Sequence, residues 1–467
     1  MDFNDNTQIK LAYEFVQYTN KNIFLTGKAG TGKTTFLYNL KLHTHKRMIV
    51  TAPTGVAAIN AGGVTIHSFF QLPFSPFVPE DAFKKPSTNI DYNRTSSSQI
   101  FKLRKNKIRI IKSLDLLIID EISMVRADLL DAIDSVLRRY RNNDKPFGGV
   151  QLLMIGDLHQ LSPVIKEEEW GLVRDYYKTV YFFSSNALKK TDFITIELKK
   201  IYRQEDEQFI QILGEVRDNR LSKQSLDILN SRYDKDFDPD EGEGYITLTT
   251  HNATALEINN RKHEKLKAKI YKFKAVIKGD FPEYIYPTHE ILELKPGAQV
   301  MFIKNDSAQE KLYYNGKIGK ITKIYDNIIY VKCAGDKNEI AVTPEIWENI
   351  KYKFDEKTKN IDEEVAGSFE QYPLKLAWAI TVHKSQGLTF DKAVIDINSA
   401  FAFGQVYVAL SRCRSLQGMV LLSKFSTYNI KTDNTIESFT EESRQNQPDN
   451  QALSLSKIDF QQKLILE

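Results

Sequence analysis

The sequence predicts an α/β fold of two parallel-sheet units, with a small subdomain inserted in the first unit and an all-β insertion in the second. Three observations support this prediction. Short apolar runs alternate with helical patterns, most runs end in small or polar residues, and a glycine-rich loop follows the first run. Buried parallel strands carry such uninterrupted apolar runs, and open α/β sheets place functional residues at the carboxyl ends of their strands.

Length and composition are those of a globular protein with several domains. A chain of 467 residues has room for about three domains, and its 42% hydrophobic and 27% charged residues are ordinary for such proteins. The formal net charge of +4, from 64 basic and 60 acidic residues, does not by itself predict binding to nucleic acid. Any basic binding surface must therefore be local.

The cysteines and the N-terminus favour a reducing compartment. Cys333 and Cys413 lie far apart without metal-binding spacing, which argues against a disulfide framework and a zinc site. The N-terminus has neither an apolar signal core nor the arginine-rich character of a transit peptide. No apolar run reaches the ~18 residues of a membrane span. We therefore expect a cytoplasmic protein without a membrane partner, and the Lys-, Asn- and Ile-rich composition is typical of a bacterial or phage enzyme.

The first unit is expected over residues 1–190. Its strands are four apolar runs, each leading into a glycine-containing or polar segment. They are NIFLTG (22–27), RMIVTAP (47–53), LLIID (116–120) and QLLMIGD (151–157). The stretch at 71–99 breaks this pattern with prolines at its start and TSSS near its end, which predicts a small inserted subdomain.

The second unit is expected in two parts, at residues 191–257 and 373–430. YITLTT (245–250), AVIDI (393–397) and MVLLS (419–423) are its predicted strands. Each is a short apolar run of the kind that buried strands carry.

An all-β insertion is expected between these parts, at residues 258–372. LYYNGKIGKITKIYDNIIYVK (312–332) reads as short strands, and Pro296-Gly297, Asn315-Gly316 and Asp326-Asn327 mark turns. We interpret the insertion as an SH3-like barrel. Residues 431–467 turn polar and predict a loosely held C-terminal tail.

The loop GKAGTGKT (27–34) has the pattern of a phosphate-binding loop. Its glycines let backbone N–H groups wrap phosphate oxygens at the N-terminus of the following helix. Lys33 is expected to reach the β- and γ-phosphates of a nucleoside triphosphate, and Thr34 to hold Mg²⁺. The alternative is a plain glycine turn, which the strand before the loop and the helical pattern after it disfavour.

Two adjacent carboxylates end the third run. Asp120 is expected to bind Mg²⁺, and Glu121 to orient the attacking water. Gln160, which follows the fourth run, can sense the γ-phosphate. Alone, the carboxylate pair and Gln160 are each typical of a solvated surface. The phosphate loop earlier in the chain favours the catalytic interpretation.

Two arginines from the second unit can complete the site. Arg203 lies in ELKKIYRQ, and Arg412 lies in the apolar helical segment VYVALSRCR. An arginine that reaches the transferring phosphate raises the rate by roughly 10³–10⁵. If both arginines reach across, hydrolysis is coupled to closure of the two units.

With these motifs the sequence resembles superfamily 1B helicases and, within them, the Pif family of 5′→3′ DNA helicases. The element at 197–213 is the most specific, the RecD-type helicases are the nearest alternative, and the likeness covers about residues 8–425. The resemblance is carried by APTGVAA (52–58), GVTIHSFF (63–70), DEISM (120–124), GDLHQLSP (156–163), ELKKIYRQEDEQFIQIL (197–213), ITVHKSQGLTFD (380–391) and QVYVALSRCRS (405–415).

The resemblance implies two RecA-like P-loop domains, a wedge-bearing subdomain at 71–99 and ATP with Mg²⁺ as cofactors. Gln8 would contact adenine, with Gln17 as the alternative. Ser162 departs from the proline of many family members, which affects only loop detail. The remaining nucleotide contacts would be Gly27, Ala29, Gly30, Thr31, Gly32, Lys33, Thr34, Thr35 and Gly387.

The resemblance also implies a single-stranded DNA track of hydroxyls, backbone N–H groups and aromatic rings. Partly buried histidines and a core role for Phe69 are the alternatives. For Phe74 and Phe77 we favour a subdomain core over a strand-separating wedge, and the basic stripe at 102–112 reads as a solvated helix face. The track would comprise Pro53, Thr54, Thr65, His67 and Phe69 in the first unit and His383, Lys384 and Ser385 in the second.

The implied activity is ATP-driven 5′→3′ translocation and DNA unwinding by a monomer, in replication, repair, recombination or telomere maintenance. Single-stranded DNA and forked or tailed duplexes would be its partners, with G-quadruplex DNA as a further family substrate. The alternatives are an RNA helicase and an ATP-gated clamp that does not unwind.

Overall fold

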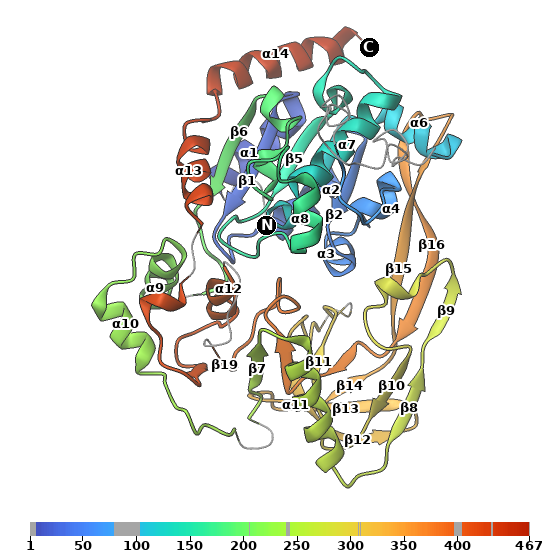
Figure 1. Cartoon of the computed structure of the whole chain (residues 1–467). Coiled ribbons are helices and arrows are strands. Elements are labelled where there is room, and N and C mark those ends of the chain that lie inside the picture. Colours follow the sequence, from blue (N-terminus) through green and yellow to red (C-terminus); the bar gives the residue numbers. More distant parts are fainter. Residues whose placement is uncertain are drawn as a thin grey trace.

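The computed structural model describes residues 6–78, 103–204, 206–239, 243–306, 308, 310–396, 404–430 and 433–466 (Figure 1). The greater part of the predicted subdomain at 71–99 lies outside these residues. In Figure 1 the first α/β unit is at the top, the second at the lower left and the β insertion at the lower right.

The first α/β unit, residues 6–198, is built on a sheet of six strands. They are β1 (Asn22–Gly27), β2 (Met48–Ala52), β3 (Val64–Thr65), β4 (Leu116–Ile119), β5 (Gln151–Ile155) and β6 (Phe193–Leu198). Their order is β3-β2-β4-β5-β1-β6 and every pairing is parallel. The four predicted runs are therefore confirmed as strands, and the segments that follow β1, β4 and β5 meet at one edge of the sheet.

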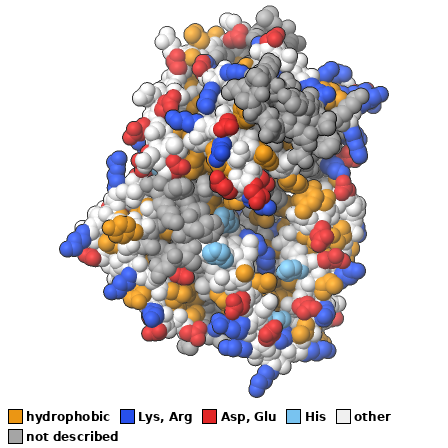
Figure 2. Space-filling view, viewed as in Figure 1, with side chains coloured by type: hydrophobic (Ala, Val, Ile, Leu, Met, Phe, Trp, Pro, Cys, Tyr) orange, Lys and Arg blue, Asp and Glu red, His pale blue; other side chains and the backbone are white. Residues whose placement is uncertain are grey.

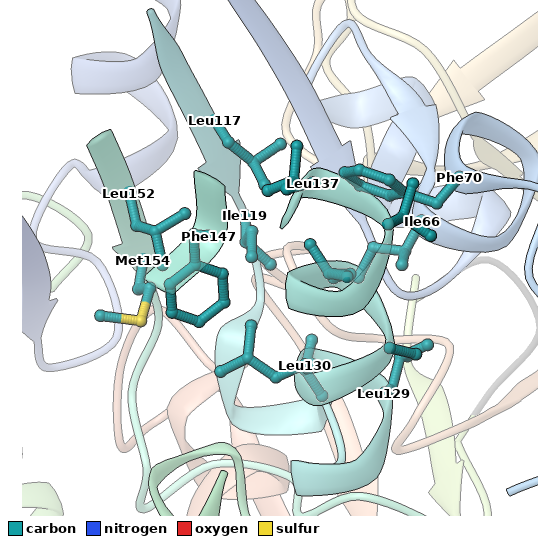
Figure 3. Close-up of a cluster of buried hydrophobic side chains, with 14 of the residues drawn as sticks. Ile66, Phe70, Leu117, Ile119, Leu129, Leu130, Leu137, Phe147, Leu152 and Met154 are labelled. Atoms are coloured by element: carbon teal, nitrogen blue, oxygen red, sulfur yellow. The ribbon is translucent and has the colours of Figure 1, made fainter. Parts of the chain in front are cut away.

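Helices cover both faces of this sheet. α1 (Thr7–Tyr18) and α2 (Lys33–His43) pack with Ile23 and Leu25, whereas Phe24 belongs to the core on the opposite face, under α7 (Ala127–Tyr140). This alternation follows from the two-residue period of a strand. Figure 3 shows strand and helix side chains of the α7 core interlocking. The other helices of the unit are α3 (Gly55–Asn60), α4 (Ile66–Phe70), α6 (Lys105–Ser113), α8 (Glu167–Val173) and the 3₁₀ helices η3 (Ile122–Met124), η4 (Pro146–Gly149), η5 (Phe182–Ser184) and η6 (Leu188–Lys190).

The second α/β unit has a smaller parallel sheet. Its strands are β7 (Ile246–Thr249), β18 (Ala379–Thr381), β19 (Ala393–Ile395) and β20 (Met419–Leu421), in the order β18-β7-β19-β20. The predicted strands at 245–250, 393–397 and 419–423 are confirmed. Its helices are α9 (Glu207–Arg217), α10 (Lys223–Asn230), α11 (Asn252–Lys265) and α12 (Gln405–Ser411).

The predicted boundary between the units at residue 190 is wrong. β6 pairs along its whole length with β1, so the first sheet continues to Leu198. The apolar content of 193–198 shows that the run is buried, but not in which sheet it lies.

The insertion consists of antiparallel strands, as expected, but with other boundaries. α11 packs on β7 and β18 and so belongs to the second unit, whereas the strand at 374–376 pairs with an insertion strand. The strands are β8 (Tyr271–Lys274), β9 (Val276–Gly279), β10 (Ile291–Leu294), β11 (Gln299–Phe302), β12 (Ile318–Tyr325), β13 (Ile328–Cys333), β14 (Ile340–Val342), β15 (Glu345–Phe354), β16 (Ile361–Gln371) and β17 (Leu374–Leu376), with η7 (Glu283–Ile285) between β9 and β10.

A five-stranded sheet, β14-β13-β12-β11-β17, forms the centre of the insertion. Asp326 and Asn327 connect β12 and β13 with φ of 51° and 60°, as a tight hairpin turn requires. The turns predicted at Gly297 and Gly316 are also confirmed by positive φ values of 90° and 103°. The SH3-like assignment stays a prediction.

A long hairpin of β15 and β16 leaves the insertion and reaches the first unit, beside α6 in Figure 1. The Tyr352 hydroxyl accepts a hydrogen bond from the Val50 N–H of β2 at 3.1 Å. Glu363 pairs with Lys41 of α2 at 2.9 Å, and Glu356 pairs with Arg109. Part of the basic stripe on α6 therefore pairs with this hairpin, although Arg109 stays 55% exposed and the stripe is largely solvated, as predicted.

The aromatic residues after α4 separate into two environments. Phe77 is buried and its backbone N–H donates to Asp128 at 2.9 Å. Phe74 is 77% exposed and stacks on the His67 ring with 4.7 Å between centroids. The predicted core role fits Phe77 and is wrong for Phe74.

The prediction of a loosely held C-terminal tail is wrong as well. Residues 434–466 form α13 (Asn434–Ser443) and α14 (Asn450–Leu466), joined to the rest by the 3₁₀ helix η8 (Thr427–Asn429). Phe439 stacks on Phe183 at 4.3 Å, and Leu453 is buried in the core under α1. Between the two helices, the Asn446 carbonyl accepts the Thr195 N–H of edge strand β6 at 2.8 Å.

Across the ranges given above, the structure contains no helix with the length and apolarity needed to cross a membrane.

Candidate active site

The phosphate loop lies between β1 and α2, as predicted. Gly30 and Gly32 have φ of 81° and 87°, where side chains are strained. A Cβ on Gly30 would lie 2.5 Å from the Cβ of Arg203, so the loop has no room for one. The loop thus presents backbone at the N-terminus of α2, where Thr34 and Thr35 are exposed. This geometry suits a bound phosphate.

Lys33 is in place to serve such a phosphate. Its Nζ donates to the carbonyls of Gly27 at 2.6 Å and Lys28 at 3.1 Å. Burial lowers the pKa of Lys33, and the nearby carboxylates of Asp157 and Glu121 oppose that effect. The amine is therefore held between the loop and the acidic groups.

Asp120 and Glu121 follow β4 at the same edge of the sheet. Burial raises the pKa of both carboxyls, and Asp120 raises that of Glu121 further. Glu121 sits at a left-handed φ of 52°, and its Oε2 accepts a hydrogen bond from Nε2 of Gln386, in the second unit, at 2.8 Å. A carboxyl with a raised pKa beside a phosphate site is suited to accept a proton.

The same edge offers the donors that Mg²⁺ prefers. Mg²⁺ is usually held by one or two carboxylates together with substrate phosphates, and the crowding of two buried carboxylates favours a cation. The Thr34 hydroxyl and the Asp120 carboxylate fit this donor set. In the described parts of the chain, no three His, Cys, Asp or Glu side chains are grouped to hold a metal without a substrate.

Gln160 is buried and held in place by Asp157. Its Nε2 donates to Asp157 Oδ2 at 3.3 Å. Asp157 in turn forms a buried ion pair with Arg217, from α9, at 3.2 Å. Burial by itself would raise the pKa of Asp157, but Arg217, Lys33 and His159 hold it at about 2. Neither Asp157 nor Arg217 was among the predicted site residues.

Both predicted arginines lie at the contact between the units. Arg203 donates to the Ser411 carbonyl at 3.3 Å, and burial together with Arg412 lowers its pKa to about 9. Arg412 is 2% exposed and donates to the Val408 carbonyl at 3.0 Å. Two arginines this close, with lowered pKa values, form a positive cluster that a phosphate group would stabilise.

Tyr407 links α12 directly to the phosphate loop. Its hydroxyl accepts the Ala29 N–H at 3.1 Å. Gly404, just before α12, lies so close to Gln160 that a Cβ would be 2.0 Å from the Gln160 carbonyl oxygen. The second unit therefore contacts both the phosphate loop and Gln160 in this structure.

The structure separates the two candidates for adenine contact. Gln17 is 4% exposed, and its Oε1 accepts a hydrogen bond from Thr44 at 2.7 Å. Gln8 instead lines a cavity of about 440 Å³, together with Thr26 and Arg444. The structure thus argues against Gln17, and a base contact by Gln8 stays a prediction.

Tyr202 is a further aromatic residue at this site. Its backbone N–H donates to the Gly30 carbonyl at 2.8 Å, and its hydroxyl accepts from Asn6 at 3.3 Å. Its ring therefore lies between the phosphate loop and the start of α1. The sequence signal was its place directly before Arg203.

The first unit presents part of the predicted DNA track. Thr54 and Thr65 cap α3 and α4 by accepting N–H groups, at 3.2 Å each, and their hydroxyl hydrogens stay free to donate. Pro53 and His67 are half-buried beside them. The prediction that Phe69 lines the track is wrong, because Phe69 is 4% exposed and packs against Phe70 in the core. A ring buried in this way cannot stack on a base.

The second unit presents the other part of the track. Lys384 is exposed and His383 is half-buried, and Gly387, predicted as a nucleotide contact, is exposed near them. The prediction that Ser385 lines the track is wrong, because Ser385 is 0% exposed and its hydroxyl donates to the Val382 carbonyl at 2.8 Å. Figure 2 shows histidine side chains gathered in the hollow between the upper and lower parts of this face.

The comparisons with known proteins agree with this geometry. The family described as PIF1-like helicase matches residues 5–227. The human ATP-dependent DNA helicase PIF1 is 34% identical over 417 residues, covering 86% of this chain and 58% of its own length. The Pif1 helicase of Campylobacter jejuni is 33% identical and covers 84% of this chain and 86% of its own length. This chain thus spans less than two thirds of the human relative.

Solved structures of Pif1 from a Bacteroides species resemble the fold. The complex with ADP-AlF4 has a TM-score of 0.85 at 40% identity, covering 95% of this chain and 98% of that one. The structure bound to single-stranded DNA has a TM-score of 0.66 at 41% identity, covering 94% of this chain and 97% of that one. The two TM-scores differ although the sequence identities are nearly equal.

Proposed function

The chain belongs to the PIF1-like helicase family, and on that premise we propose that it is an ATP-dependent 5′→3′ DNA helicase. The observation that carries the proposal is the meeting of both α/β units at one phosphate site. Lys33, Asp120 and Glu121 come from the first unit. Arg203 comes from the segment that directly follows this unit, and Arg412 lies at the end of α12 in the second unit. A site divided in this way can convert hydrolysis into relative movement of the two units.

Hydrolysis would divide its tasks among these residues. The backbone of Gly30 and Gly32 and the amine of Lys33 bind the phosphates, and Gln8 contacts the base. Mg²⁺ held by Thr34 and Asp120 would offset the phosphate charge. Glu121 orients the attacking water and accepts its proton, while Arg203 and Arg412 stabilise the charge that develops on the γ-phosphate.

Single-stranded DNA is the proposed track, with forked and tailed duplexes as substrates. Thr54, Thr65, His67, His383 and Lys384 would contact its backbone, which makes binding largely independent of sequence. G-quadruplex DNA, action as a monomer, a cytoplasmic location and roles in replication, repair or recombination belong to the same proposal.

We further infer that DNA binding rearranges the units. This chain is arranged more like the Bacteroides protein with ADP-AlF4 than like that protein bound to single-stranded DNA. In the arrangement seen here the β15–β16 hairpin is bonded to the first unit through Tyr352 and Glu363. Rearrangement on DNA would release these contacts.

The test is ATP- and Mg²⁺-dependent unwinding of a duplex with either a 5′ or a 3′ single-stranded tail. We expect unwinding of the 5′-tailed duplex alone, and none with Lys33→Ala, because that change removes the amine that binds the phosphates. Lys21→Ala, at an exposed lysine just before β1, is the matched control. Preference for a 3′ tail would overturn the polarity, and retained turnover in Lys33→Ala would overturn the phosphate site. Stimulation by RNA above DNA would favour an RNA helicase.

A further inference from the structure

The ion pair between Asp157 and Arg217 crosses the boundary between the two units. Asp157 follows β5 in the first unit, and Arg217 ends α9 in the second. The two side chains are 0% and 4% exposed, and Arg217 Nη2 lies 3.2 Å from Asp157 Oδ1. Burying two charges is unfavourable unless their geometry and remaining hydrogen bonds compensate for lost water, so the pair needs an explanation.

Asp157 uses both of its oxygens. Oδ1 accepts from Arg217 and from the His159 N–H at 3.2 Å, and Oδ2 accepts from Nε2 of Gln160 at 3.3 Å. An amide NH₂ has two hydrogens. Asp157 takes one from Gln160 and thereby restricts the direction of the other.

The ion pair between Asp157 and Arg217 serves more than the packing of α9. Arg217 Nε is buried and, within the described residues, has no hydrogen-bond partner, which is unfavourable for stability. The helix α9 is also held independently by apolar residues such as Phe209 and Ile212, both buried in the core of the second unit. The fold therefore does not depend on Arg217 alone to hold α9.

Building on the proposed function, we propose that Arg217 is a positioning residue for ATP hydrolysis. Through Asp157 it orients Gln160, and it does so only while Arg217 on α9 of the second unit reaches Asp157, which follows β5 in the first. The γ-phosphate sensor is thus assembled by contact between the units. If the units separate, Gln160 loses its orientation although its own loop is unchanged.

The test compares steady-state ATPase parameters in the full chain with single-stranded DNA present. We expect Arg217→Ala to lower kcat by at least about tenfold with less than about threefold change in KM for ATP, because an orienting contact acts in the transition state. Arg217→Lys should recover part of kcat, since it restores the charge. Arg220→Ala, at an exposed arginine three residues further on, is the matched control and should behave as wild type.

A double-mutant cycle separates positioning from mere structure. Arg217→Ala combined with Gln160→Ala should be no slower than Gln160→Ala alone, because the first change acts through the second residue. The inference would be overturned if the two losses in kcat multiply in the double variant. It would also be overturned if Arg217→Ala alone keeps a kcat within about twofold of wild type. If Arg217→Ala does not fold, as thermal unfolding would show, the cycle is run with Asp157→Asn and judged by the same outcomes.

The two proposals can fail separately. Loss of turnover in Lys33→Ala with normal turnover in Arg217→Ala would leave the proposed function standing and sink only the positioning role. Normal turnover in Lys33→Ala would remove the proposed function itself.

Discussion

Arg412 combines a catalytic prediction with a structural one. Its guanidinium donates to the carbonyls of Val408 and Leu388, at 3.0 and 3.4 Å, and to the Ser411 hydroxyl at 3.0 Å. It is among the largest fully buried side chains of the described structure. These bonds fix the position of the guanidinium and also hold the end of α12.

We expect Arg412→Ala to lower the ATPase rate by at least about a hundredfold and also to lower the melting temperature. Each buried acceptor that loses its donor costs about 1–3 kcal/mol. ATPase assays and thermal unfolding measure the two effects. Arg414→Ala is the control, because Arg414 is 51% exposed and pairs with Asp391 at the surface. Near-normal turnover in a destabilised Arg412→Ala would show that the arginine is purely structural.

At the scale of elements, α13 is held by aromatic contacts. Phe439 stacks on Phe183 at 4.3 Å and also lies within 6.0 Å of Phe24, between ring centroids. Offset and edge-to-face pairs of this kind add to the apolar area that they bury. The helix thus extends the α7 core past β6, and the linker to α14 lines the cavity that contains Gln8.

Phe439→Ala should destabilise the protein by about 2 kcal/mol, below the ~3–5 kcal/mol typical of a fully buried phenylalanine because Phe439 is partly buried. Chemical denaturation would measure the loss. Tyr428→Ala, at a ring that is 92% exposed, should leave the free energy of unfolding nearly unchanged. Equal stability of both variants would show that α13 does not contribute to the core.

At the scale of the whole molecule, contacts between distant segments define the arrangement. Tyr407 reaches Ala29 in the phosphate loop, Gln386 reaches Glu121, and Tyr352 of the hairpin reaches Val50. The first two join the α/β units at the candidate site. The third contact attaches the insertion to β2, which lies in the half of the first sheet away from β6.

We expect single-stranded DNA to lengthen the distance between the hairpin and the first unit. Spin labels at Tyr38→Cys on α2 and Val365→Cys on β16 would report it, since both positions are exposed and the native cysteines are buried. A pair at Tyr38→Cys and Leu172→Cys, both exposed within the first unit, is the control and should not change. An unchanged hairpin distance with DNA bound would rule out the rearrangement inferred here.

The sequence alone determined four of the six strands of the first sheet and three of the four strands of the second, the phosphate loop, the carboxylate pair that follows β4 and most of the turns of the insertion. These features are local. A buried strand is a continuous apolar run, and a glycine at positive φ is needed wherever the backbone turns in that way, so neighbouring residues carry the signal. The family resemblance rests on the same local motifs.

Only the tertiary structure decided which distant residues meet. It joined Asp157 to Arg217, buried Gln17, Phe69 and Ser385, added β6 to the first sheet and packed the C-terminal helices onto that unit. Burial and ion pairing depend on what the rest of the chain brings near a residue, and a short stretch of sequence does not contain that information. The polar character of 431–467, for example, described the outer faces of two helices whose inner faces are part of the core.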